Sequence, residues 1–224
     1  GIYKYLLNAD GTLELIGLAA VSNNPSFLAL SNDKKHLVAV NEINIDGVGT
    51  VESFLVSDDS LQFISRSSSG GAHPCFVAID DNGYVLTANY TGGNIGLLKI
   101  DNEDVLSDVL DIQQHVGSGG TERQKSPHAH SVWFEPESNN IIAVDLGTNG
   151  LYFSTLDSAN NQLSDNPNKI EMKQGAGPRH LAFHPNHKWL YVVNELDCTV
   201  TLLTKSDNGE YENNASVSTL PTNY

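Results

Sequence analysis

Short apolar runs alternate with polar turns along the whole chain, and one such pattern occurs four times. Each copy has a short strand, a polar turn and a second, strongly apolar strand. The four copies are Pro25 to Glu42, Pro74 to Tyr90, Ala129 to Leu146 and Pro178 to Glu195. Their equivalent apolar positions recur after 49, 55 and 49 residues, at Leu28, Val77, Val132 and Leu181. Self-similarity at such a period is typical of repeat architectures, in which each unit buries its apolar faces against its neighbours.

Two further strands follow each copy. We expect the third strands at Val51 to Val56, Asn94 to Ile100, Gly150 to Leu156 and Thr199 to Thr204. A turn rich in Asp and Asn then leads to a fourth strand, such as Leu61 to Ser67 or Lys169 to Lys173. Four antiparallel strands in about 50 residues make the blade of a β-propeller. The second strands (HLVAV, YVLTA, NIIAV and WLYVV) are almost continuously apolar, which predicts burial on both faces between neighbouring blades.

The predicted fold class is therefore all-β, a single β-propeller domain of four-stranded antiparallel blades over residues 1–224. The stretch from Gly1 to Ala20 supplies only the last two strands of a preceding blade, and blade units follow at 21–69, 70–124, 125–174 and 175–224. This count gives about four and a half blades. We expect a fragment of a closed ring, with completion by association as the alternative.

Composition and charge restrict the partners. The chain has 224 residues, 12 of them basic and 27 acidic, for a formal net charge of −15. Such a surface repels phosphate backbones, so we expect no nucleic-acid partner, and no run approaches the apolar length of a membrane span. Cys75 and Cys198 lie in different repeats, and the first residues lack the features of a signal peptide. Free thiols in a reducing cytoplasm are the expectation.

Side chains able to do chemistry gather at equivalent points of the repeat. The innermost strand of a propeller blade lines the central channel, and the loops that enter it form a funnel. The loops before the first strands carry His73, His128, His130, Arg179 and His180, and the ends of the second strands carry Asn89, Asp145 and Glu195. This concentration predicts a small-molecule site at the channel mouth.

Three of these residues suggest a reaction. His130 titrates near neutrality and suits proton transfer, although a hydrogen bond between blades is the alternative. Arg179 follows the rigid Gly175–Pro178 stretch and is suited to bind a carboxylate, a phosphate or a developing oxyanion. A structural ion pair between Arg179 and Glu195 is compatible with that role, and a carboxylate such as Glu195 at the end of a buried strand needs a partner or a function.

Arg123 lies in the insertion Gly117 to Ser126, where it either meets a phosphate or is simply solvated. His184 and His187 fall in the polar turn of the last repeat and are expected at the surface rather than in a metal site. No motif requires a metal or an organic cofactor, and the chain has no GxSxG nucleophile elbow.

Several motifs resemble those of the seven-bladed β-propeller lactonase family. They are Ala88–Asn94 (ANYTGGN), Glu122–Gln124 (ERQ), Pro127–Val132 (PHAHSV), Gly177–Pro185 (GPRHLAFHP) and Val193–Leu196 (VNEL). That family includes bacterial 6-phosphogluconolactonases of the propeller type and fungal carboxymuconate-lactonizing enzymes. The resemblance implies a catalytic His, Arg and Glu at His130, Arg179 and Glu195, and a second Arg from a later blade. Phe76 departs from the pattern, because many relatives have His there.

The leading hypothesis is a metal-independent hydrolase of an anionic sugar lactone, with His73, Asn89, Arg123, His128, Asp145 and His180 as further substrate-binding candidates. The alternatives are a lactonizing cycloisomerase acting on a carboxylated substrate, and a non-catalytic propeller module. The enzyme hypotheses require His130, Arg179 and Glu195 to converge on one pocket. The oligomeric state stays open.

Overall fold

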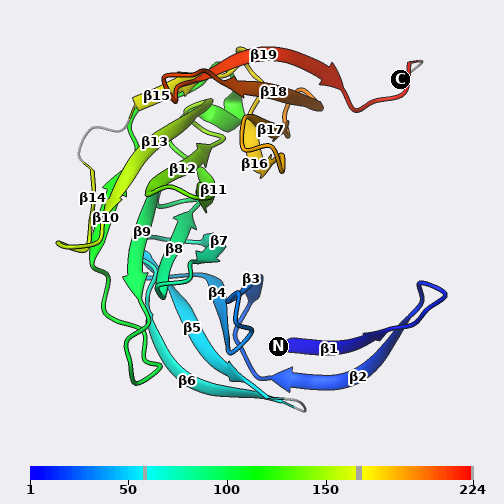
Figure 1. Cartoon of the computed structure of the whole chain (residues 1–224), viewed down its shortest axis with the longest axis vertical. Coiled ribbons are helices and arrows are strands. Elements are labelled where there is room, and N and C mark those ends of the chain that lie inside the picture. Colours follow the sequence, from blue (N-terminus) through cyan, green and yellow to red (C-terminus); the bar gives the residue numbers. More distant parts are fainter. Residues whose placement is uncertain (58–59, 165–167, 223–224) are drawn as a thin grey trace.

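The computed structural model describes residues 1–57, 60–164 and 168–222. The described residues form five antiparallel sheets arranged in an open arc (Figure 1). The strands are β1 (Ile2–Leu7), β2 (Leu13–Ala20), β3 (Pro25–Leu30), β4 (His36–Ile45), β5 (Val48–Val56), β6 (Leu61–Ser68), β7 (Pro74–Ile79), β8 (Tyr84–Asn89), β9 (Asn94–Lys99), β10 (Asp111–Gln114), β11 (Ala129–Phe134), β12 (Asn140–Asp145), β13 (Gly150–Asp157), β14 (Gln162–Leu163), β15 (Asn168–Glu171), β16 (Pro178–Phe183), β17 (Trp189–Asn194), β18 (Thr199–Lys205) and β19 (Tyr211–Ser218).

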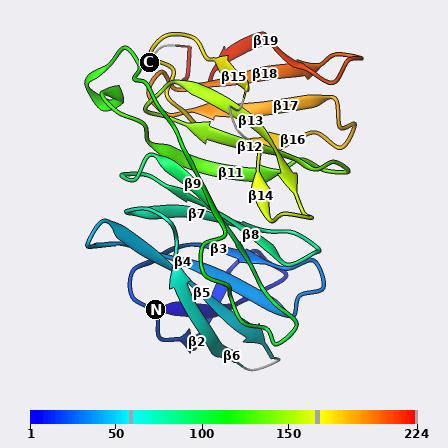
Figure 2. The ribbon, with the colours of Figure 1, turned by 90° about the vertical axis from the view of Figure 1, so that its left-hand side faces the viewer.

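The strands of each blade follow one another in sequence order, from the inside of the arc to its rim. The four-stranded sheets run β3-β4-β5-β6, β7-β8-β9-β10 and β16-β17-β18-β19, and β1 pairs only with β2. Strands β3, β7, β11 and β16 lie on the concave side (Figure 1), and the view from the side shows the sheets stacked one on another (Figure 2). The predicted all-β propeller of four-stranded antiparallel blades is confirmed, and β1 and β2 form a two-stranded sheet.

The blade built on β11 differs from the expectation at its outer strand. Strand β13 pairs with two short segments, β14 and β15, instead of one continuous strand. Strand β15 ends at Glu171, before the predicted end at Lys173. The side-chain amide of Asn149 accounts for this end, because it donates to the carbonyl oxygens of Met172 and Lys173, each at 3.0 Å.

The core lies between the blades rather than inside any one of them. One apolar cluster joins β8 and β9 to β11 and β12, and another joins β12 and β13 to β16, β17 and β18. Every residue of β8 is buried, as its apolar sequence predicts. The same prediction is wrong for β17, where Trp189 is 41% exposed and Val193 40% exposed. One face of β17 packs on the preceding blade, and the other face stays partly exposed.

The helical content is small. The one helix among the described residues is a 3-10 turn, Glu122–Gln124, inside the insertion that lengthens the second repeat period. No helix in the described part of the chain has the length and apolar character needed to cross a membrane.

Candidate active site

Each four-stranded unit has a β-bulge at the start of its inner strand. Register shifts place the bulges between Pro25 and Phe27, Pro74 and Phe76, Ala129 and Ser131, and Pro178 and His180. The residues left without a partner are Ser26, Cys75, His130 and Arg179. A bulge redirects a side chain out of the regular alternation. All four side chains line one cavity of about 400 Å³, so the repeat delivers one residue per blade to a common site.

A second position of the repeat also supplies the cavity. The residue after the Asn or Asp of each second strand donates its backbone N–H to the carbonyl that precedes the inner strand. These bonds are Glu42 to Asn24 (3.0 Å), Tyr90 to His73 (2.9 Å), Leu146 to His128 (3.0 Å) and Glu195 to Gly177 (2.8 Å). Glu42 and Tyr90 line the cavity directly, together with Phe27, Arg123 and His180.

Glu195 joins two arginines at the cavity. Its Oε2 lies 3.1 Å from Arg179 Nε, and its Oε1 lies 3.0 Å from Arg123 Nη2. Arg123 Nη2 also donates to Tyr90 Oη at 3.2 Å. The side chain of Arg179 stays 43% exposed and that of Arg123 56% exposed, so the ion pairs orient the two arginines without enclosing them. Arg123 and Arg179, 56 residues apart in sequence, therefore present cationic groups to one space.

His130 is buried in the wall of the cavity, with 8% of its surface exposed. Its Nδ1 lies 3.8 Å from the sulfur of Cys75, and Nε2 has no hydrogen-bond partner among the described residues. Burial lowers the pKa of His130, and the positive charge of Arg179 lowers it further. The imidazole is therefore neutral at neutral pH and able to accept a proton.

His180 lies beside His130, with the ring centroids 5.4 Å apart. Its ring contacts Phe76 at 5.3 Å, edge to face, and Phe76 in turn packs on Phe27 and Trp133. Burial among these rings lowers the pKa of His180 to about 4, with the charge of Arg179 contributing. Phe76, the departure from the family pattern, is thus a core residue beneath the cavity rather than part of its lining.

Asn89 and Asp145 do not line the cavity. Each ends the second strand of its blade, one residue before the repeat position of Glu42 and Tyr90. Because side chains alternate along a strand, those of Asn89 and Asp145 point into the protein. Asn89 donates to Ser69 O at 3.0 Å, whereas Asp145 Oδ2 lies 2.7 Å from His115 Nδ1. Burial alone would raise the pKa of Asp145, but its hydrogen bonds, that of His115 first, outweigh burial and lower the pKa. Both residues hold the blades together.

His73 and His128 also lie outside the cavity lining. His73 has a left-handed backbone (φ 52°) just before its inner strand, and its Nδ1 lies 2.9 Å from Thr91 Oγ1. His128 stacks on Tyr90 with ring centroids 4.4 Å apart, and its Nδ1 lies 3.0 Å from Tyr90 O. His128 therefore supports a residue that faces the cavity.

Five lining residues were not chosen as site candidates from the sequence: Ser26, Phe27, Glu42, Cys75 and Tyr90. The alignment of the four copies held the signal, because Ser26 and Cys75 share a column with His130 and Arg179, and Glu42 and Tyr90 share one with Glu195. Cys75 is no nucleophile at neutral pH, since burial, followed by the charge of Glu42, raises its pKa to about 12.

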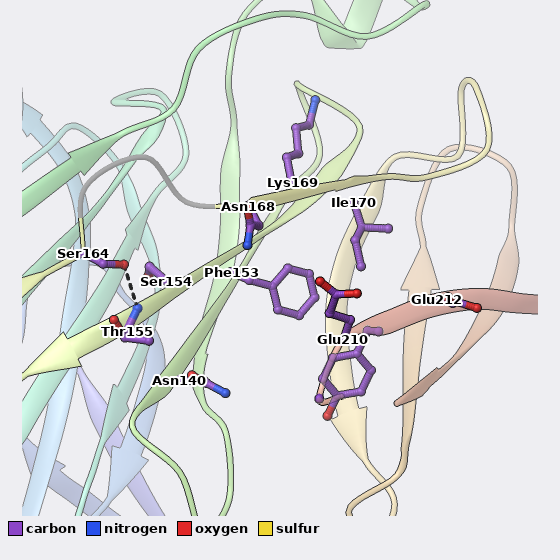
Figure 3. A pocket seen from close by; sticks show the side chains of 12 residues that line it. Asn140, Phe153, Ser154, Thr155, Ser164, Asn168, Lys169, Ile170, Glu210 and Glu212 are labelled. Atoms are coloured by element: carbon purple, nitrogen blue, oxygen red, sulfur yellow. Dashed lines mark hydrogen bonds between the residues drawn. The ribbon is translucent and has the colours of Figure 1, made fainter. Parts of the chain in front are cut away.

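A larger groove, of about 540 Å³, lies between β13, β15 and the turn that precedes β19 (Figure 3). Its walls are mainly neutral polar side chains, and its cation Lys169 is already engaged by Thr148 O at 2.9 Å and Glu171 Oε1 at 2.6 Å. None of the candidate residues lies there. In the described ranges, no group of three or more His, Cys, Asp or Glu side chains is placed to hold a metal ion.

The chain is similar to known proteins along its whole length. The chain matches the family model described as "Lactonase, 7-bladed beta-propeller" over residues 1–224. It is 34% identical to a 6-phosphogluconolactonase of Bacillus subtilis, a match that covers 100% of this chain and 64% of that protein. It is 29% identical to a 6-phosphogluconolactonase of Formosa agariphila over 90% of this chain and 59% of that protein. Among solved structures, a periplasmic gluconolactonase of Pseudomonas aeruginosa superimposes with a TM-score of 0.89 at 27% identity, over 100% of this chain and 66% of that one. The chain thus spans about three fifths of the length of these curated relatives.

Proposed function

Because this chain belongs to the 7-bladed β-propeller lactonase family, we propose that its cavity hydrolyses an anionic sugar lactone of the 6-phosphogluconolactone type. One observation carries the proposal: His130 and Arg179 occupy equivalent bulges and line the same cavity, where Glu195 joins Arg179 to Arg123. The proximity of Glu195 to these two cavity-lining residues supports the enzyme hypotheses. The names of the relatives support a lactone as the substrate.

The reaction follows from the protonation states. Neutral His130 takes a proton from water, and the water oxygen forms a bond to the lactone carbonyl carbon. The tetrahedral intermediate carries a negative oxygen, which a fixed guanidinium stabilises. The ring C–O bond then breaks, and the imidazolium of His130 returns its proton to the leaving alkoxide. The product is an open-chain hydroxy acid, and no other reactant is consumed.

The two arginines divide the remaining work. We assign the oxyanion to Arg179, because its charge already acts on His130 and lowers the pKa of that imidazole. We assign the anionic group of the substrate to Arg123, whose side chain is the more exposed of the two. Glu195 orients both. His180 contributes to the wall of the cavity as a neutral ring.

Replacing Arg179 with Ala tests this assignment. The protein, expressed as its gene encodes it, is assayed for hydrolysis of 6-phosphogluconolactone above the spontaneous rate. Loss of one oxyanion donor is expected to lower kcat by about 100-fold or more. Lys188→Ala is the matched control, because this exposed cation lies in the turn at the far end of β16. Undiminished turnover by the Arg179→Ala protein would remove Arg179 from the mechanism.

The lactonizing cycloisomerase remains the second enzymatic candidate, since two arginines near one histidine also suit a substrate with two carboxylates. The same assay separates the two when a muconolactone is included with the sugar lactones. Turnover of the sugar lactones alone supports the hydrolase.

A further inference from the structure

Two glutamates, one in the cavity lining and one beside it, occupy equivalent positions of the repeat and have different partners. Glu42 and Glu195 each follow the Asn of a second strand and make the same backbone hydrogen bond. Both carboxylate oxygens of Glu195 are taken by arginines. The carboxylate of Glu42 lines the cavity and has no hydrogen bond or ion pair with any residue that the structure describes.

The position of Glu42 is well defined even though its carboxylate has no partner. Its backbone N–H donates to Asn24 O at 3.0 Å, and its carbonyl accepts from Asn24 Nδ2 at 2.6 Å. Asn24 has the left-handed backbone (φ 48°) that precedes the inner strand. The chain therefore holds Glu42 by both backbone groups at the cavity edge and leaves its side chain half-buried. Partial burial of an unpaired carboxylate is unfavourable, which points to a partner beyond the residues that the structure describes.

The charges divide the cavity into two sides. Arg179 and Arg123 come from β16 and from the 3-10 turn, whereas Glu42 comes from β4, at the other end of the lining. The charge of Glu42 reaches Cys75 and His130, because it raises the pKa of both groups. The cavity thus presents hydrogen-bond donors on one side and a free acceptor on the other.

We propose that Glu42 is a specificity-determining residue that accepts hydrogen bonds from hydroxyl groups of the substrate ring. This inference rests on the proposed lactonase function and deepens it. A polyhydroxylated lactone has donors for the carboxylate and an anionic group or carbonyl for the arginines. A lactone without hydroxyl groups leaves Glu42 without a partner, and a second carboxylate on that side is repelled.

The test compares two lactones of the same ring size, glucono-δ-lactone with its hydroxyl groups and δ-valerolactone without them. Glu42→Ala is expected to lower kcat/KM for gluconolactone by about 10- to 100-fold, the range for a hydrogen bond to a charged group. The value for δ-valerolactone is expected to change by less than about 3-fold, because that substrate makes no such bond. Glu103→Gln, which changes an exposed carboxylate in a distant turn, is the matched control. An equal fall for both lactones, or no fall for either, would overturn the inference.

A binding measurement separates this inference from the proposed function. Titration of the wild-type and Glu42→Ala proteins with gluconate and with hexanoate needs no turnover. Weaker binding of gluconate alone in the variant supports the role of Glu42 even if the protein hydrolyses neither lactone, in which case only the proposed function fails. Identical gluconate binding by both proteins overturns the inference.

The thermal midpoint of Glu42→Gln provides the folding control. Removing an unpaired, half-buried charge is expected to leave the midpoint unchanged or higher. A clear decrease would show that the carboxylate stabilises the fold and would contradict its assignment to the substrate.

Discussion

Gln124 connects the loop that carries Arg123 to the turn between β12 and β13. Its side chain is fully buried, and Nε2 donates to Leu146 O at 2.8 Å and to Asn149 Oδ1 at 3.0 Å. Asn149 Oδ1 also accepts from the backbone N–H of Gly177 at 3.0 Å, in the loop before Arg179. Hydrogen bonds through Asn149 therefore link Gln124 to the loop that precedes Arg179. Replacing Gln124 tests whether this network holds the two arginine-bearing loops together.

Two substitutions of Gln124 by side chains of similar size distinguish the effect of losing the amide from the effect of adding a charge. Gln124→Met removes both donated bonds and leaves the carbonyl of Leu146 without a partner, while Asn149 Oδ1 keeps the bond from Gly177. One orphaned buried acceptor lowers the free energy of unfolding by about 1–3 kcal/mol. Gln124→Glu places a carboxylate against two oxygen acceptors, and the expected loss at pH 7.5 is about 3 kcal/mol or more.

The pH dependence sharpens this comparison. Burial raises the pKa of the introduced carboxyl above its unfolded value of about 4.3, so stability is lost as the pH rises past that value. At low pH the protonated acid donates one of the missing bonds. Urea denaturation at pH 5 and pH 7.5 should therefore bring Gln124→Glu closer to Gln124→Met at the lower pH, by about 1 kcal/mol or more. Equal stability of the two variants at pH 7.5 would refute the conclusion that the Gln124 amide donates to two buried oxygen atoms.

Two further predictions concern stability elsewhere in the chain. Arg66 Nε donates at 3.0 Å to Glu52, whose carboxylate is fully buried, so Arg66→Met should cost roughly 3 kcal/mol by urea denaturation. Adding Glu52→Gln should recover most of that loss, and a cost below about 1 kcal/mol would contradict the argument. His180 has a folded pKa of about 4 against an ordinary value of 6.5, so the unfolded chain binds its proton first as the pH falls. Stability should decrease between pH 6.5 and 4, by up to about 3 kcal/mol from this group. His180→Phe should remove that part of the acid sensitivity, and an unchanged pH profile would count against the buried neutral ring.

The sequence by itself determined the architecture. Apolar second strands that recur about every 50 residues have to be covered on their faces, and stacking against the neighbouring repeat is the way to cover them. The repeat register also singled out His130, Arg179 and Glu195, because equivalent positions of a repeat occupy equivalent places.

Tertiary structure decided which of those positions reach the cavity. Alternation along a strand predicts a side of the sheet, but a bulge changes it, and the bulges brought Ser26 and Cys75 to the site beside His130. Asn89 and Asp145 are engaged by partners from distant segments, such as His115, which no local pattern predicts. Arg123 reaches Glu195 across 72 residues, a contact that no local pattern encodes. Hydrophobic periodicity is a local property, whereas the pairing of polar groups depends on segments that only the folded chain brings together.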